Sequence, residues 1–211
     1  MKRWSIAVPG AVLGLWLAAC ASVPPPRLIL LTNDEARPTV AGTTRPLLAV
    51  RGVQLPEYLL RSAVVYRASD AELARFPDAE WAERLNVAVT RWIAQQLAAE
   101  LPQYDVHAYG GAAAPALALE VTLTRFEAVA PQTFQLRGDW RLARPGAAEP
   151  VAEAGLSADV PLSALTPEGV VAAMNTALKQ ASQSIAERLR ALQVGEAPAP
   201  SDAAPAAPTG N

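Results

Sequence analysis

Two segments of the chain place apolar residues every three or four positions, which is the pattern of an amphipathic helix. The clearer one spans residues 167–192. It follows Thr166, a favourable N-cap residue, and has Pro167 at its first helical position. A continuous stripe of this kind is typical of core packing rather than of a ligand site. We therefore predict a long helix that is buried along one side.

The other helical pattern spans residues 78–101 and is ended by Pro102. Its apolar arc includes Trp81 and Trp92, with charged residues on the opposite side. We expect both indoles to be structural.

Three later segments alternate apolar and polar residues with period two, which predicts strands with one dry and one wet face. They are residues 117–124, 134–142 and 152–160, and turns near Pro131 and Pro145 separate them. Short connections favour antiparallel pairing, so the three should form a meander. Shorter strand candidates are residues 47–55, 63–68 and 104–109.

These elements predict an α+β fold. We expect a two-layer sandwich, with a mainly antiparallel sheet and two long helices on one face.

The first residues have the pattern of a secretory leader: Lys2 and Arg3, then an apolar run too short and too broken to span a bilayer permanently. The run ends Leu-Ala-Ala-Cys at Cys20, which resembles the bacterial lipobox. We predict that residues 1–19 are a signal peptide and that Cys20 is the acylated N-terminus. The alternative is an ordinary signal with a chance cysteine. Ala21 in place of an aspartate favours the periplasmic face of the outer membrane of a Gram-negative bacterium.

The two ends of the mature chain differ in composition from its middle. Residues 20–27 read as a lipidated cysteine with a Pro-rich stalk, and residues 195–211 as a disordered tail rich in Pro and Ala. Residues 28–194 are left as a single domain.

The composition of the chain limits the kinds of functional site that it can form. The net charge is −2, so nothing recruits nucleic acid by charge. One Cys and one His, His107, are too few for a zinc site or a disulfide framework. No nucleotide-binding, metalloprotease or esterase motif occurs, and we interpret His107 as a partly exposed strand residue. We predict no catalytic, cofactor or metal site, and no enzyme.

Several stretches resemble the auxiliary lipoproteins of ABC-type transport systems, the PqiC/YmbA-like family. They are V-Q-L-P-E-Y-L at 53–59, R-S-A-V-V-Y-R-A-S-D-A-E-L at 61–73, W-A-E-R-L at 81–85 and G-D-W-R-L at 138–142. Arg84 departs from the proline that many members carry there. Their order and spacing, behind a lipobox, carry the resemblance.

The resemblance implies a non-enzymatic docking component at the outer membrane. Its partners would be a periplasmic MCE-domain protein and the inner-membrane transporter components that move lipids or other apolar molecules between membranes. A different function stays open: an envelope lipoprotein that itself binds an apolar ligand between helices and sheet.

The wet face of the predicted sheet carries both signs of charge and could pair with a second copy, helped by an apolar rim. We therefore expect a homo-oligomer. The charged residues are Arg137, Asp139, Arg141, Glu120, Glu153 and Asp159, and the expected rim is Pro56, Tyr58 and Leu59.

Overall fold

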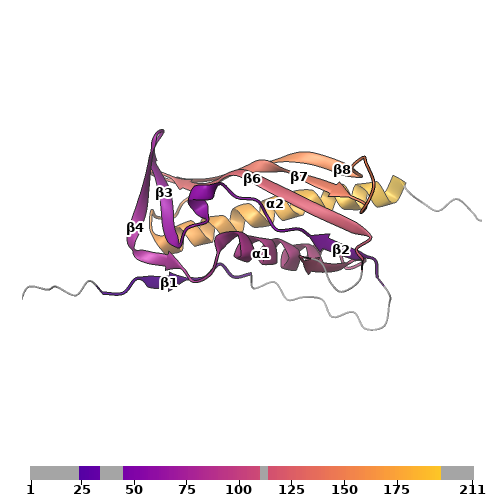
Figure 1. Cartoon of the computed structure of the whole chain (residues 1–211). Coiled ribbons are helices and arrows are strands. Elements are labelled where there is room, and N and C mark those ends of the chain that lie inside the picture. Colours follow the sequence, from indigo (N-terminus) through magenta and orange to yellow (C-terminus); the bar gives the residue numbers. More distant parts are fainter. Residues whose placement is uncertain (1–23, 34–44, 110–113, 196–211) are drawn as a thin grey trace, which may run out of the picture.

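One mixed sheet and two long helices make up the fold in a computed structural model that describes residues 24–33, 45–109 and 114–195 (Figure 1). Within these residues the sheet has eight strands. Their bounds are β1 Arg27–Ile29, β2 Leu47–Val50, β3 Ala63–Ser69, β4 Glu72–Trp81, β5 Asp105–Ala108, β6 Leu117–Val129, β7 Thr133–Ala143 and β8 Ala152–Pro161. The helices are α1 Leu85–Glu100 and α2 Pro167–Gly195, with a short 3-10 turn, η1, at Glu57–Leu59. The predicted α+β class is confirmed.

The long strand β6 organises the sheet. Along one side it pairs with β7, and β7 pairs with β8, both antiparallel, so the predicted meander is confirmed. Along its other side β6 pairs in parallel with β2 near its start and with β3 near its end. The sheet is therefore mixed, because β2 also runs parallel to β5, and β1 to β4.

A bulge explains why β6 is longer than its alternation predicts. Leu119, Val121 and Leu123 face the core, and the register then shifts between Leu123 and Arg125. After the shift Phe126 and Ala128 are the buried residues. An extra residue in one strand interrupts the period of two, so the pattern ends before the strand does.

The predicted start of the first helix is wrong. Residues 78–81 belong to β4, and α1 begins only at Leu85. Trp81 is buried as expected, but its backbone N–H donates to Ser62 at 2.6 Å in the sheet. Trp81 and Leu85 are four residues apart, so a strand residue and a helix residue together imitate helical spacing.

The second helix agrees with its prediction. Thr166 Oγ1 accepts a hydrogen bond from the Gly169 N–H at 3.1 Å, as an N-cap does. The helix runs to Gly195, so the first residue assigned to the tail is the last of α2, while residues 196–211 lie outside the described part.

The helices lie together on one side of the sheet, and a single hydrophobic core between the two layers extends from Leu31 to Leu189 (Figure 1). Its largest side chains include Trp140 and the edge-to-face pair of Phe126 and Phe134, whose ring centroids are 5.1 Å apart. All residues of this core follow the proposed anchor at Cys20.

Gly138 of β7 lies directly against the backbone of β6. A Cβ there would lie 2.1 Å from the Thr122 carbonyl oxygen. We expect Gly138→Ala to lower the free energy of unfolding by about 1–3 kcal/mol, because two backbones must separate. The matched control is Gly155→Ala on β8, where the nearest atom is 3.9 Å away. Urea unfolding of both variants measures the difference, and equal effects would contradict the close approach.

Candidate functional site

The predicted lipidation residue, Cys20, lies outside the described residues. Within them, neither helix is long and apolar enough to cross a membrane, and no group of three or more metal-ligating side chains comes together. His107 lies on β5 and is partly exposed, as expected, with its Nε2 2.9 Å from Asp105 Oδ2.

The most buried charged group in the described part of the chain is Glu127, near the C-terminal end of β6. Its Oε1 accepts a hydrogen bond from Arg67 Nε at 2.6 Å, and its Oε2 accepts one from the Tyr58 hydroxyl at 2.6 Å. Arg67 also donates to the Asp70 carbonyl at 3.0 Å. The carboxylate is therefore satisfied by groups from two other segments.

Local backbone contacts bring Tyr58 to this strand. The segment before η1 runs beside β6: the Gln54 N–H donates to the Val121 carbonyl at 3.0 Å, and the Gln54 carbonyl accepts from the Leu123 N–H at 2.9 Å. The turn at Pro56 then places Leu59 in the core, only 3% exposed. We expected Leu59 to be part of an exposed apolar rim that contacts a second copy. That expectation is wrong, because Leu59 packs in the core of its own chain.

Burial, together with the hydrogen bond to Glu127, raises the pKa of Tyr58 to about 12. A phenol in an unfolded chain has a pKa near ~10. Since the folded pKa is the higher one, the folded chain holds its proton more tightly. The resulting stabilisation is complete below pH ~10 and is lost as the pH rises from ~10 towards 12.

We expect Tyr58→Phe to remove this loss between pH ~10 and 12, because no phenol remains to ionise. The measurement is the free energy of unfolding at several alkaline pH values for both chains. The difference between the chains should shrink with rising pH; a constant difference would contradict the buried, neutral phenol.

Sequence reasoning missed this cluster. Tyr58 and Arg67 both lie in the stretches that carry the family resemblance, which was the available signal. Glu127 gave none, because it lies beyond the bulge, in a part of β6 that the alternation did not cover.

The hairpin of β3 and β4 projects from the body of the fold (Figure 1). The rings of Tyr66 and Phe76 contact each other across it in a tilted arrangement, with centroids 4.9 Å apart, and Leu73 is 39% exposed. Beside it, on the segment of β1, Leu28 and Leu30 are also exposed. This end of the molecule therefore offers apolar side chains to a partner or a membrane surface.

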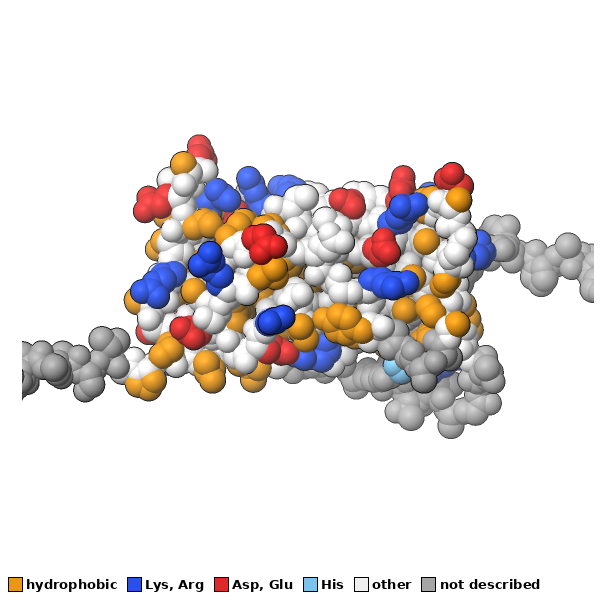
Figure 2. All heavy atoms as spheres, in the orientation of Figure 1, with side chains coloured by type: hydrophobic (Ala, Val, Ile, Leu, Met, Phe, Trp, Pro, Cys, Tyr) orange, Lys and Arg blue, Asp and Glu red, His pale blue; other side chains and the backbone are white. Residues whose placement is uncertain are grey.

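Charges of both signs are scattered over the face seen in Figure 2, with hydrophobic side chains between them. On the outer face of the sheet, Arg137 donates to Asp159 at 2.6 Å. Arg137 and Asp159 were both expected to contact a second copy of the chain, but they form an ion pair with each other within one chain.

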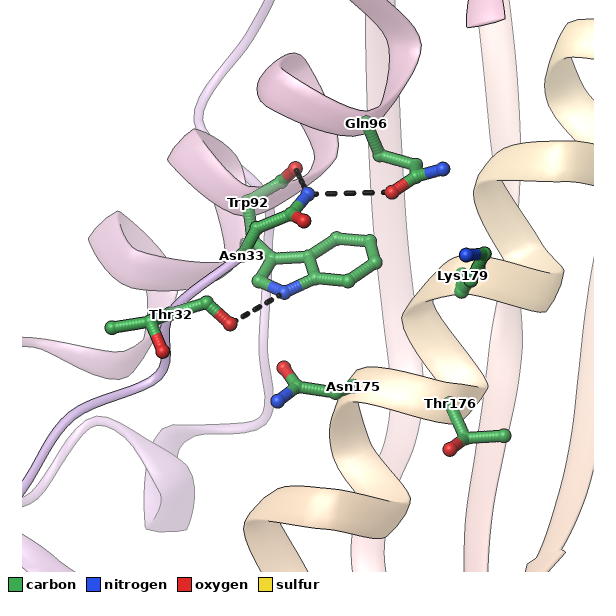
Figure 3. A pocket seen from close by; sticks show the side chains of 7 residues that line it. All are labelled: Thr32, Asn33, Trp92, Gln96, Asn175, Thr176 and Lys179. Carbon is green, nitrogen blue, oxygen red and sulfur yellow. Dashed lines mark hydrogen bonds between the residues drawn. The ribbon is translucent and has the colours of Figure 1, made fainter. Parts of the chain in front are cut away.

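A polar groove of about 420 Å³ lies between α1, α2 and the segment after β1 (Figure 3). The Trp92 indole N–H donates to the Thr32 carbonyl at 3.2 Å, and the Asn33 amide donates to Gln96 Oε1 at 3.4 Å. Asn175 Oδ1 is buried there and has no hydrogen-bond partner among the residues that the structure describes. The two hydrogen bonds in this groove attach the segment after β1 to α1.

Comparison with known proteins gives a family match over most of the fold. The model for the ABC-type transport auxiliary lipoprotein component matches residues 30–186. The intermembrane transport lipoprotein PqiC of Escherichia coli K12 is 27% identical over 148 residues, covering 69% of this chain and 76% of that protein. PqiC of Shigella flexneri gives the same values.

Two crystal structures share the fold. One, of an uncharacterized protein, has a TM-score of 0.66 at 21% identity and covers 78% of this chain and 99% of that one. The other, a protein from Xanthomonas campestris, has a TM-score of 0.60 at 17% identity and covers 82% and 96%.

Proposed function

Because the chain belongs to the family of ABC-type transport auxiliary lipoprotein components, we propose that it is an intermembrane transport lipoprotein that docks an MCE-type ABC transport system at the outer membrane. The system would move lipids or other apolar molecules between the bacterial membranes. The observation that carries this is the family match over residues 30–186, which spans β2 to β8 and most of both helices. Similarity to PqiC, an intermembrane transport lipoprotein, supports it.

The proposed attachment follows from the N-terminus. Residues 1–19 are removed, and acyl chains on Cys20 hold the protein on the periplasmic face of the outer membrane. A stalk of residues 20–27 spaces the domain from the bilayer. Its last residue, Arg27, is the first of β1, so at ~3.1 Å per residue the six residues 21–26 reach about 19 Å, with three consecutive prolines to stiffen them.

The proposed role is docking rather than catalysis. Glu127 is the most buried charged residue of the described part of the chain. Its carboxylate oxygens are hydrogen-bonded to Arg67 and Tyr58 and are not exposed to a substrate. The partners are a periplasmic MCE-domain protein and its inner-membrane transporter components, with no nucleic acid. A homo-oligomer of the domain would suit contact with such an assembly, and light scattering on residues 21–211 tests it.

The decisive experiment is genetic. In the source bacterium, the gene for this chain and the gene for its MCE-domain protein are deleted singly and together, and envelope permeability is measured with a detergent. If the two proteins act in one machine, each deletion gives the same defect and the double deletion is no worse. Additive defects, or no defect from losing this chain alone, would contradict the proposal.

Cys20→Ser is expected to abolish acylation, because a hydroxyl cannot form the thioether that precedes cleavage. Labelling with a palmitate analogue should drop to background, and the protein should leave the outer-membrane fraction. Ser22→Ala is the matched control, which keeps the thiol and should label normally. Labelled Cys20→Ser protein would contradict the lipidation site.

A further inference from the structure

The segment of β1 is apolar on both of its faces. It reads R-L-I-L-L from Arg27 to Leu31, and successive strand residues point to opposite faces. Ile29 is half-buried and Leu31 is buried on the face that packs on the core. Leu28 and Leu30 share the opposite face and are 68% and 56% exposed. An unbroken apolar run is typical of a strand covered on both faces, yet this chain covers only one.

Leu28 and Leu30 are the two most exposed large apolar side chains among the described residues. Within those residues β1 pairs only with β4, so it forms an edge of the sheet. Figure 2 shows hydrophobic side chains along the lower left edge of the molecule, the end at which Figure 1 places β1. Exposed apolar side chains that lie next to one another mark a surface used for contact.

This outward face belongs to a strand that is fixed in position. The Arg27 guanidinium donates to Asp78 at 3.0 Å and to Glu168 at 2.7 Å, which attaches β1 to β4 and to the start of α2. The Ala82 N–H donates to the Ile29 carbonyl at 2.9 Å. The cation of β1 is therefore matched by two carboxylates, and the strand presents its leucines in a defined direction.

The chain before β1 indicates what covers these leucines. Between Cys20 and Leu31, only Ser22 and Arg27 have polar side chains, so apolar character continues from the proposed acylated residue to the core. The stalk limits the distance of the domain from the bilayer to about 19 Å and leaves its tilt free. A stalk that pivots at its acylated end and lies along the bilayer brings Leu28 to the lipid surface.

The charges around β1 set the depth of such a contact. Glu80 of β4 is in register with Leu28, and a carboxylate is costly in hydrocarbon. The leucines therefore reach the boundary between headgroups and acyl chains, as in other interfacial segments. The tip of the projecting hairpin is less suitable, because the exposed Asp70 and Glu72 lie near Leu73.

We propose that Leu28 and Leu30 rest on the lipid surface of the membrane that holds the acylated cysteine, as a second point of attachment. This inference rests on the attachment at Cys20 in the proposed function. It orients the domain: Glu168 bonds to Arg27, so the N-terminal end of α2 lies at the membrane. The 29 residues of α2 then carry its other end about 40 Å away, towards a partner in the periplasm (Figure 1).

The experiment supplies a synthetic anchor. Residues 21–211 contain the whole described core, and a histidine tag in place of Cys20 binds them to phosphatidylcholine vesicles that contain a nickel-chelating lipid. A fluorophore is attached at Ala82→Cys, an exposed position beside β1, because Cys20 is the only natural cysteine. Quenching is the ratio of emission from vesicles without and with a nitroxide on the headgroups. The result does not depend on acylation in the cell or on an MCE partner, so it is independent of the genetic test of docking.

We expect the quenching at residue 82 to fall at least twofold in the double variant Leu28→Gln, Leu30→Gln, although the tag still holds that protein on the vesicle. The matched control is Leu73→Gln, an exposed leucine of the hairpin tip, which should leave the quenching unchanged. A fluorophore at Ala191→Cys, an exposed position near the far end of α2, gives the baseline. Thermal unfolding verifies that each variant is folded.

Two results would overturn the membrane contact. One is equal quenching at residue 82 in the unsubstituted chain and the double variant. The other is an oligomer of residues 21–211 in light scattering that the double variant loses, because a second copy would then cover the leucines.

Discussion

Trp92→Ala is expected to lower the free energy of unfolding by about 3–5 kcal/mol, the usual range for truncating a core aromatic. The indole is 3% exposed and lies on the side of α1 that faces the core. It also donates its N–H to the Thr32 carbonyl, so the substitution removes one of the hydrogen bonds between α1 and the segment after β1 (Figure 3). Urea unfolding measures the loss.

The control for Trp92 is Gln95→Ala, a half-buried position of the same helix, expected to change stability by less than about 0.5 kcal/mol. Trp92→Phe should recover part of the lost stability, because it restores ring volume without the donor. A Trp92→Ala chain as stable as Gln95→Ala would mean that α1 is not packed on the core as described.

Glu127→Gln is expected to cost about 3 kcal/mol. Removing one partner of a buried ion pair typically costs ~3–5 kcal/mol, because the other charge is left without compensation. The Arg67 side chain is 20% exposed, so water can reach it and the lower end of that range applies. Tyr58 loses its charged acceptor at the same time.

A double-mutant cycle with Arg67→Met isolates the pair. We expect a coupling of at least about 1 kcal/mol, since the two side chains are in direct contact. Glu120→Gln, on the same strand but exposed and without an ion pair to any described residue, is the matched control and should have little effect. Additive effects of the Glu127 and Arg67 substitutions would contradict the buried pair.

If the pair behaves this way, its function is to hold the family's characteristic segment in place. Tyr58 and Arg67 come from stretches that resemble the family, and both are attached to one carboxylate on the central strand. A single buried charge then reinforces the position of η1 and of the projecting hairpin on β6, in addition to the backbone pairing of β3 with β6.

Local features of the sequence were enough for the elements whose signals are local. The long helix α2 carries its own cap at Thr166, and the meander of β6, β7 and β8 has period-two alternation with short turns between strands. Family membership was accessible for the same reason, because Pro, Tyr and Trp recur at fixed spacing along the chain. The proposal of Cys20 as the lipidated residue likewise rests on its immediate neighbours in the sequence, without reference to the fold.

The tertiary structure decided what depends on residues far apart in the chain. The parallel pairs, such as β2 with β6, join strands separated by α1, and no local pattern records them. The hairpin strand β4 was hidden because Trp81 imitates helical spacing. The Glu127 cluster gathers side chains from η1, β3 and β6. Periodicity reports which side of an element is buried, whereas a site depends on which elements meet, and only the packed fold sets that.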